Sequence, residues 1–382
     1  MTSDHPYFMC QLVHQWLDFR VAELEAAAHA AGVRLSISPE DVAALRGGSE
    51  GVLLRIGVDD EASVVRLASR AVLCKTFFEV WASGDTWEEL EESIKQVPSA
   101  QSDRYLAAGT TFRVRVVRFG LKCSPAEQKD IINKLAPLLP WRGKVQLSHP
   151  DHTFCVVMDV PQEQVSRKAD GQADGMRTQP LPLTGHAAGP PGRYYFGRLV
   201  AEGQRGLVGT LDLKKRNYIG TTSLDAELSL VMANLARVGR TDLVYDPYCG
   251  TGSCLVAAAA FGARVQGADL FLPVLQGKLR TRCGPSALQQ ASDQGIAQTF
   301  SQYGFPCPVG TAHADSGRHL HFFRTAAHGL FDAIITDPPY GIREKPAAMD
   351  DEPLIARLLP EDQARLPSRR LSLHSHPILH NP

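Results

Sequence analysis

The stretch Asp246-Pro247-Tyr248-Cys249-Gly250-Thr251-Gly252-Ser253 lies between the short apolar run Asp242-Leu243-Val244-Tyr245 and an Ala-rich run at residues 253–261. The first run predicts a buried strand and the second a helix. Gly250 and Gly252 allow the chain to turn tightly and to approach a ligand, and the helix that follows offers free backbone N–H groups. The stretch therefore predicts a βα unit of a parallel sheet, either with a plain tight turn or with a ligand-binding loop.

Two aspartates follow at the ends of further predicted strands. A nicotinamide-binding loop is one alternative for the stretch, but the third Gly or Ala of that fingerprint falls on Leu255. Asp269 ends a strand predicted at residues 265–268, where a carboxylate can accept both ribose hydroxyls of a nucleoside cofactor. Asp315 lies where a third strand would end and can face an adenine amino group. Taken singly, each is also compatible with an ordinary strand-end or helix-cap aspartate.

The most informative motif is Asp337-Pro338-Pro339-Tyr340-Gly341, directly after an apolar strand predicted at residues 331–336. The two prolines remove two backbone donors and leave carbonyl groups exposed. The Asp337 side chain and the Pro338 carbonyl can each accept one hydrogen of an amine, which aims the nitrogen lone pair at a methyl sulfonium. Tyr340 offers a flat face for stacking a base. A Pro-rich βα loop capped by Asp337 is the structural alternative.

The N-terminal part has an α+β pattern. Its predicted strands are at residues 7–13, 51–56, 73–80, 111–117, 145–147 and 153–160. Its predicted helices are at residues 17–31 and 64–71, from Asp85 or Thr86 onward, and from the capping sequence Ser124-Pro125-Ala126-Glu127 to about residue 139. Residues 161–192 are rich in glycine and proline, so they read as a flexible linker or, alternatively, a binding loop.

Composition excludes several classes of protein. The chain has 382 residues, of which 44% are hydrophobic and 21% charged, so two or three folded domains are expected. A net charge of −1 excludes a polybasic nucleic-acid binder, although a local basic patch can still bind RNA. No apolar run approaches the ~20 residues that span a bilayer, and the N-terminal residues do not have the pattern expected of a secretory signal. The eight cysteines form no C-x-x-C pair, which argues against a zinc site or disulfide framework and favours a reducing, cytoplasmic location.

The D-P-P-Y motif after an apolar strand resembles that of class I S-adenosylmethionine-dependent amino-methyltransferases. Four segments are more narrowly similar to the family of eukaryotic catalytic subunits of tRNA (guanine-N2)-methyltransferases that act at position ten. They are residues 213–220 (L-K-K-R-N-Y-I-G), 222–229 (T-S-L-D-A-E-L-S), 232–234 (M-A-N) and 337–344 (D-P-P-Y-G-I-R-E). The resemblance covers residues 197–344.

This resemblance implies a domain organisation, a cofactor and partners. It implies an α/β, Rossmann-like class I methyltransferase domain at residues 193–345, after an α+β RNA-binding region at residues 1–160 that contains a THUMP-like domain. S-adenosyl-L-methionine would be the cofactor, tRNA the substrate, and a small zinc-binding activator subunit the partner. Residues 346–382 carry many prolines and predict an irregular tail, so the methyltransferase domain is expected to be truncated after its fourth strand.

The resemblance also implies roles for individual residues. The methionine part of the cofactor would be surrounded by Asp246, Tyr248, Gly250 and Gly252. Asp269 would hold its ribose and Asp315 its adenine, and Ser223 and Asp225 would complete the pocket. The catalytic residues, which would hold the guanine, are Asp337, Pro338 and Tyr340. Cys249 is expected to serve packing in the turn, because direct methyl transfer needs no nucleophile.

Two basic clusters are candidates for binding RNA phosphates. One comprises Arg113, Arg115, Arg118 and Lys122, without an intervening acid, and the other is the triplet Lys214-Lys215-Arg216. A solvated strand face or loop is the alternative for each cluster.

Two other functions stay open from the sequence. An adenine-N6 methyltransferase acting on DNA or RNA would use the same amine chemistry, although the N-terminal α+β region favours structured RNA. A non-catalytic, truncated form that binds RNA or a subunit would use none of it.

Overall fold

The computed structural model of the protein describes residues 7–46, 51–119, 123–159, 194–220, 222–278, 295–316 and 329–339. It divides into two compact units. The first unit comprises Met1–Leu24, Val33–Ser69 and Leu73–Gly203, and the second comprises Glu25–Gly32, Arg70–Val72 and Gln204–Pro382. Each unit has its own sheet.

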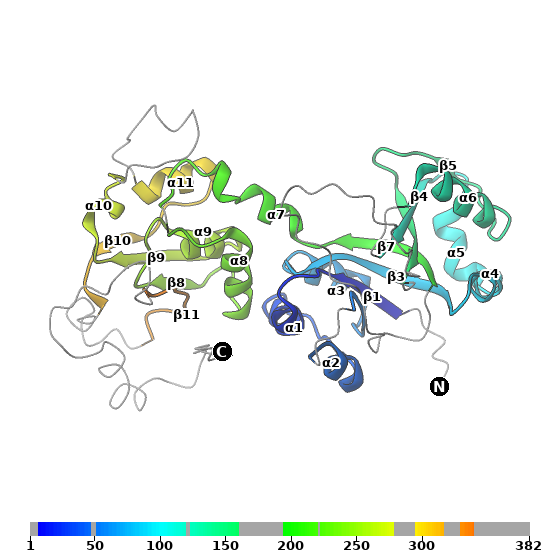
Figure 1. Cartoon of the computed structure of the whole chain (residues 1–382), viewed down its shortest axis with the longest axis horizontal. Helices are drawn as coiled ribbons and strands as arrows, with labels where there is room; N and C mark the ends of the chain where they lie inside the picture. Colours follow the sequence, from blue (N-terminus) through cyan, green and yellow to red (C-terminus); the bar gives the residue numbers. More distant parts are fainter. Residues whose placement is uncertain are drawn as a thin grey trace, which may run out of the picture. The chain divides into compact units, whose positions relative to one another are not determined.

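The first unit is built on a mixed sheet of seven strands (Figure 1). In spatial order the strands are β2 (Leu53–Ile56), β1 (Tyr7–Leu12), β3 (Cys74–Gly84), β7 (Tyr194–Glu202), β6 (His152–Met158), β4 (Thr111–Arg118) and β5 (Lys144–Val145). Neighbouring strands are antiparallel from β2 to β6, whereas β4 is parallel to both β6 and β5.

The helices of this unit begin at the residues that local capping chemistry favours. They are α1 (Arg20–Ala30, which extends into the second unit) after the short 3-10 helix η1 (Leu17–Phe19), α2 (Pro39–Arg46), α3 (Glu61–Ala68), α4 (Trp87–Lys95), α5 (Ser99–Leu106) and α6 (Pro125–Leu135). The predicted capping sequence is confirmed at α6, where Ser124 and Glu127 bond each other's backbone N–H groups. Thr86 caps α4 by accepting from the Glu89 backbone. The sequence did not predict α2 or α5.

An aromatic core covers one face of this sheet. Phe154 and Phe196 stack with their ring centroids 6.0 Å apart, and Trp81 packs edge-on against both. Helices α4, α5 and α6 gather at the β4–β5 end and bury Leu90, Ile94, Leu106 and Leu135 against the aromatic cluster (Figure 1).

Strand β7 corrects the predicted domain boundary. The sequence placed residue 193 at the start of the second domain, but β7 pairs with both β3 and β6 in the N-terminal sheet. The boundary therefore follows Gly203. Gly197 is required within β7, because a Cβ there would lie 2.0 Å from the Glu79 carbonyl oxygen of β3.

The second unit has a parallel sheet in the order β10-β9-β8-β11. Its strands are β8 (Leu243–Asp246), β9 (Arg264–Asp269), β10 (Gly310–His313) and β11 (Ala333–Ile334). Its helices are α7 (Arg205–Thr210), the 3-10 turn η2 (Leu213–Lys215), α8 (Ala226–Leu235), α9 (Ser253–Ala260), α10 (Leu272–Leu275) and α11 (Gly295–Tyr303). Alternating strands and helices give the predicted Rossmann-like α/β domain.

Short segments from the N-terminal half of the sequence complete this second unit. Arg70 Nε donates to the Asn234 Oδ1 at 3.2 Å, and Asn234 Nδ2 donates to the Arg70 carbonyl at 2.8 Å. The Arg70 guanidinium also lies 3.9 Å from the centroid of the Phe261 ring. Sequence analysis assigned residues 70–72 to the N-terminal region, because nothing local indicates a partner so distant in the chain.

Some predictions lie outside the described residues. These are the linker at residues 161–192, the tail at residues 346–382, and the side chains of Lys122 and Tyr340. Among the helices that the structure does describe, none combines the length and apolar composition needed to cross a membrane.

Candidate active site

The order of the second sheet locates its ligand-binding edge. The chain passes from β8 outward to β9 and β10, and then returns to the other side of β8 to form β11. In open α/β sheets, ligands bind outside the carboxyl ends of the strands where the order reverses, here between β8 and β11. Asp246 ends β8, and Asp337 follows β11 by a few residues.

The loop after β8 needs both of its glycines. Gly250 and Gly252 have φ values of +51° and +89°, in the left-handed region that favours glycine. A Cβ on Gly252 would also lie 3.0 Å from Ile296 Cγ2 of α11. Around the Cβ position of Gly250, by contrast, no heavy atom of the described residues lies within 4 Å, so this side of the loop is open to a ligand.

Close packing against β9 fixes the same loop. The Cys249 N–H donates to the Ala268 carbonyl at 2.8 Å. A Cβ on Gly267 would lie only 2.8 Å from Cys249 Sγ, so the strand must carry glycine at this point. Burial raises the pKa of the Cys249 thiol, which stays protonated. This state agrees with the predicted packing role of Cys249.

Asp269 connects the end of β9 to the glycine loop. Its Oδ2 accepts from the Gly250 N–H at 2.8 Å, and its Oδ1 accepts from the Phe271 N–H at 2.8 Å. Each carboxylate oxygen has a further lone pair for a ligand hydroxyl. Leu270 and Phe271 follow it directly with 42% and 57% of their surfaces exposed.

Asp315 lies beyond the end of β10, in the same row of strand ends. Its neighbour Ser316 donates from Oγ to the Pro247 carbonyl at 2.8 Å, which ties this segment to the loop after β8. Nearby, burial raises the pKa of the Tyr248 hydroxyl. The structure thus brings Asp315 and Tyr248, both predicted from the sequence, to one edge of the sheet.

Asp246 links the glycine loop to the segment after β11. It is 2% exposed, and its Oδ1 accepts from the Tyr248 N–H at 3.0 Å and from Thr336 Oγ1 at 2.7 Å. The pKa of Asp246 is raised to about 7, chiefly by burial and to a smaller extent by the negative charges of Asp269 and Asp337. Asp337 directly follows Thr336, so it lies at the same edge of the sheet as Asp246.

Asp337 and Pro338 are exposed, directly after Thr336. This exposure leaves them accessible to a substrate. Sequence analysis missed Thr336, although its position before the D-P-P motif is the signal that would have indicated it.

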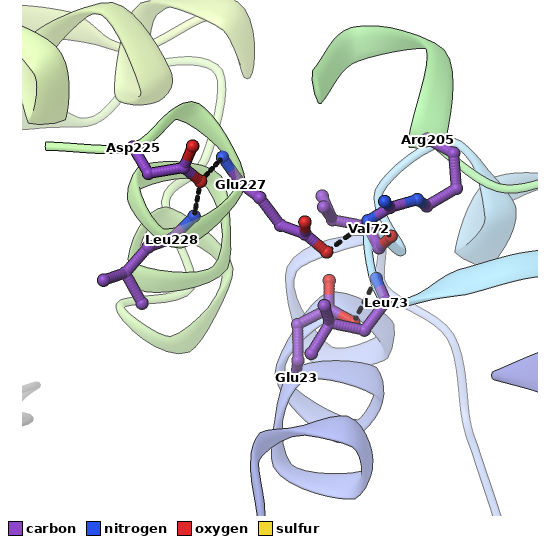
Figure 2. Close-up of polar contacts among 7 residues, drawn as sticks. All are labelled: Glu23, Val72, Leu73, Arg205, Asp225, Glu227 and Leu228. Carbon is purple, nitrogen blue, oxygen red and sulfur yellow. Dashed lines mark hydrogen bonds and ion pairs between the residues drawn. The ribbon is translucent and has the colours of Figure 1, made fainter. Parts of the chain in front are cut away.

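Ser223 and Asp225 have different environments. Ser223 Oγ lies 2.6 Å from Thr251 Oγ1 of the glycine loop and accepts from the Gly220 N–H at 2.8 Å, and its role in the cofactor pocket stays a prediction. Asp225 is the N-cap of α8: its Oδ1 accepts from the N–H groups of Glu227 at 2.8 Å and Leu228 at 3.3 Å (Figure 2). These hydrogen bonds of Asp225 stabilise the helix, and its role in the cofactor pocket stays a prediction.

Helix α8 is further anchored by an ion pair. Figure 2 shows Arg205 extended toward Glu227, with which it pairs, and Arg205 Nη1 also donates to the Val72 carbonyl at 3.5 Å. A second contact in the same figure, within the first unit, joins the Leu73 N–H to Glu23 Oε2 at 3.4 Å.

The triplet Lys214-Lys215-Arg216 does not form one exposed cluster. Lys214 and Lys215 are exposed, and Lys215 Nζ donates to the Gly209 carbonyl at 2.5 Å. Arg216 is only 5% exposed, and its Nη1 donates to Ser253 Oγ at 3.0 Å. Including Arg216 among the RNA-binding residues was therefore wrong, because its guanidinium faces the interior of the unit.

The arginines of β4 are divided between the two faces of the strand. Arg113 and Arg115 share one face, and Arg118 lies on the other, since successive side chains alternate. Arg115 pairs with Glu202 at 3.1 Å and Arg118 with Glu127 at 4.0 Å, whereas Arg113 donates to Thr153 Oγ1. No acidic residue lies within this cluster in the sequence, but the fold places acidic residues beside Arg115 and Arg118.

Comparison with known families matches both units. Residues 6–173 match the family described as the Tmrp11 THUMP N-terminal domain, and residues 214–369 match the RMKL-like methyltransferase domain. Among solved structures, TrmN from Thermus thermophilus is similar with a TM-score of 0.43 and 16% identity, covering 88% of this chain and 80% of that one.

Curated proteins extend the similarity along most of the chain. The chain is 33% identical over 342 residues to the tRNA (guanine(10)-N(2))-methyltransferases TRMT11 of Mus musculus and Homo sapiens, and 28% identical over 352 residues to that of Dictyostelium discoideum. Each match covers 88% of this chain; it covers 66% of the mouse and human proteins and 62% of the Dictyostelium protein, so the chain spans just under two thirds of their length. The chain thus matches a THUMP N-terminal domain and an RMKL-like methyltransferase domain, and it is similar to the TRMT11 proteins over most of its own length.

Proposed function

We propose that this chain transfers a methyl group from S-adenosyl-L-methionine to the exocyclic N2 amine of a guanine in tRNA. The observation that carries the proposal is the convergence of Asp246, Thr336 and Asp337 beside the glycine loop, at the strand ends where the sheet order reverses. The names of the curated relatives support the choice of guanine and tRNA.

The chemistry of the strand ends fits this cofactor. Gly250 leaves open space beside the loop, and the carboxylate of Asp269 is fixed by two backbone N–H groups while keeping lone pairs for ribose hydroxyls. The exposed side chains of Leu270 and Phe271 offer apolar surface for a flat base, with Asp315 at the neighbouring strand end. The hydroxyl pair of Ser223 and Thr251 can serve the polar methionine end.

The reaction needs little more from the protein than alignment. The bound cofactor supplies an electrophilic methyl group on a positively charged sulfur. Asp337 and the Pro338 carbonyl accept the two amine hydrogens and hold the nitrogen lone pair in line with that group. The proton that the amine loses goes to Asp337 or to water, and Tyr340 is proposed to stack on the guanine.

Partners and location are part of the same proposal. The resemblance of the chain to the catalytic subunits of tRNA (guanine-N2)-methyltransferases suggests a small zinc-binding activator subunit. A cytoplasmic location is proposed from the absence of a C-x-x-C pair among its cysteines. Co-expression with candidate activator subunits, followed by measurement of molar mass in solution, tests the first. Imaging of the tagged full chain tests the second.

A two-step experiment tests the proposed activity. Calorimetry measures binding of S-adenosylhomocysteine to the full chain, and labelled S-adenosylmethionine is then supplied with unmodified tRNA, with and without the candidate activator. Nucleoside analysis of the product should detect N2-methylguanosine. N6-methyladenosine would instead identify the adenine alternative, and tRNA binding without cofactor binding would identify a non-catalytic protein.

A further inference from the structure

The backbone on both sides of Arg216 is held by a single side chain of α11. Gln302 Nε2 donates to the Lys215 carbonyl at 2.6 Å, and Gln302 Oε1 accepts from the Asn217 N–H at 2.8 Å. Lys215 and Asn217 are exposed, whereas Arg216 and Tyr218 are buried, so the segment alternates between solvent and interior. The Gln302 clamp thus directs Arg216 inward and leaves the neighbouring lysine outside.

Inside the unit, Arg216 reaches the start of α9. Its Nη1 donates to Oγ of Ser253, the first helical residue, directly after Gly252 of the glycine loop. Within the described part of the chain Arg216 forms no ion pair, and its Nε is buried without a hydrogen-bond partner. The buried Tyr303 hydroxyl lies beside the guanidinium and raises its pKa, which burial lowers.

An arginine in this position is costly to bury and needs a reason. Burial lowers the pKa of the Arg216 guanidinium, and a buried cation without a carboxylate partner is unfavourable. Its hydrogen bond to Ser253 places the guanidinium at the start of α9, directly after the glycine loop.

We propose that Arg216 is a positioning residue, which fixes Ser253 and with it the glycine loop. It acts on the cofactor through the loop and does not touch the RNA. Its effect on the cofactor rests on the proposed function, but its effect on the loop does not. The two effects can therefore be measured separately.

Four single variants of the full chain, and the double variant that combines Arg216→Met with Ser253→Ala, test this role. Arg216→Met removes the charge and the donors, Arg216→Lys keeps the charge without the planar fork, and Ser253→Ala removes the acceptor alone. Arg264→Met is the matched control, because Arg264 is an exposed arginine of the same unit. Hydrogen exchange of residues 250–256 is measured without ligand, and S-adenosylhomocysteine affinity by calorimetry, with the melting temperature of each variant as reference.

We expect Arg216→Met to speed loop exchange by about tenfold and to weaken S-adenosylhomocysteine binding by roughly 10- to 100-fold, as for loss of a charged hydrogen bond. Ser253→Ala should give a smaller change in the same direction, and the double variant should lose less than the sum of the two. Arg216→Lys should recover part of the affinity, and Arg264→Met should change neither measurement.

Several results would overturn the proposal. Loop exchange within twofold of the unsubstituted protein in Arg216→Met is one, and fully additive losses in the double variant are another. If Arg216→Met does not fold, normal loop exchange in Ser253→Ala is sufficient to reject it. If the unsubstituted chain does not bind S-adenosylhomocysteine, the proposed function fails, while the exchange measurement still decides the role of Arg216.

Discussion

Two buried arginines, Arg198 of the first unit and Arg216 of the second, have opposite electrostatic environments. In the first unit, Arg198 of β7 is neutralised: it pairs with the buried Glu79 at 3.1 Å and with the half-exposed Glu61 at 2.6 Å, and its guanidinium lies 4.1 Å from the centroid of Tyr105. In the second unit, Arg216 donates to the Ser253 hydroxyl and has no carboxylate partner among the described residues, and Asp246 is buried near other acids. The comparison sets a charge that is neutralised within a sheet against charges that are not neutralised near a ligand-binding edge.

Removing the neutralised arginine, Arg198, should have the largest effect on stability. Arg198→Met leaves the carboxylate of Glu79 buried without its cation, which typically lowers the free energy of unfolding by about 3–5 kcal/mol. Denaturant unfolding of the full chain measures the loss. Arg115→Met is the matched control on the same sheet, since its pair with Glu202 is more exposed and worth about 0–1 kcal/mol.

A second substitution makes this prediction specific to charge. Adding Glu79→Gln to Arg198→Met should recover part of the stability, because no isolated charge remains in the interior. Equal stability of the single and double variants would show that Arg198 contributes through packing alone.

At the ligand-binding edge of the second sheet, the exposed Asp337 should contribute to catalysis and not to folding. Asp337→Ala removes an acceptor for the amine, which should lower methyl transfer by two to three orders of magnitude, equivalent to about 3–4 kcal/mol. Its melting temperature should stay close to that of the unsubstituted protein, since Asp337 is exposed. The measurement is single-turnover methylation of tRNA under saturating cofactor.

The matched control for this variant is Asp332, which directly precedes the first residue of β11. Asp332 accepts from the Leu243 N–H at 2.8 Å, so Asp332→Ala should cost about 1 kcal/mol of stability and leave the methylation rate unchanged. Near-normal turnover by Asp337→Ala would show that Asp337 takes no part in the reaction.

The buried acid should make stability depend on pH. The pKa of Asp246 is about 7 in the folded protein and 3.8 when unperturbed, so its contribution to stability is full below about pH 4 and is lost as the pH rises to 7. Within that window the loss has a limiting slope of about 1.4 kcal/mol per pH unit. Asp246→Asn should flatten the profile while keeping both hydrogen bonds, because Thr336 and Tyr248 donate to the same oxygen. Urea titrations at pH 4 to 7 measure the profile. If Asp246→Asn depended on pH as strongly as the unsubstituted protein, Asp246 would not be the group that titrates in this range.

Local signals in the sequence predicted much of the fold and of the site, and contacts between distant parts of the chain determined the rest. The capping sequence at Ser124 and the βα unit around Gly250 depend on near neighbours, and both formed as expected. Strand β7 reads as the start of an α/β domain until its pairing with β3 is known. Arg216 follows two lysines, so its local sequence predicts a solvent-facing cation, and only Gln302 of α11 directs it inward.

The smallest expected effect concerns the exposed part of the same triplet. Lys214 and Lys215 face solvent directly before Arg216, and each can meet a phosphate of the proposed tRNA substrate. Replacing both with Ala should weaken tRNA binding without sequence preference and should reduce the slope of log affinity against log salt by roughly 0.7–0.9 per lysine. Arg216→Met should leave that slope unchanged, because its guanidinium is buried. Filter binding at several salt concentrations measures both slopes. If Arg216→Met changed the slope as much as a lysine substitution does, the buried arginine would reach the RNA in solution, and the division between inward and outward cations would be wrong.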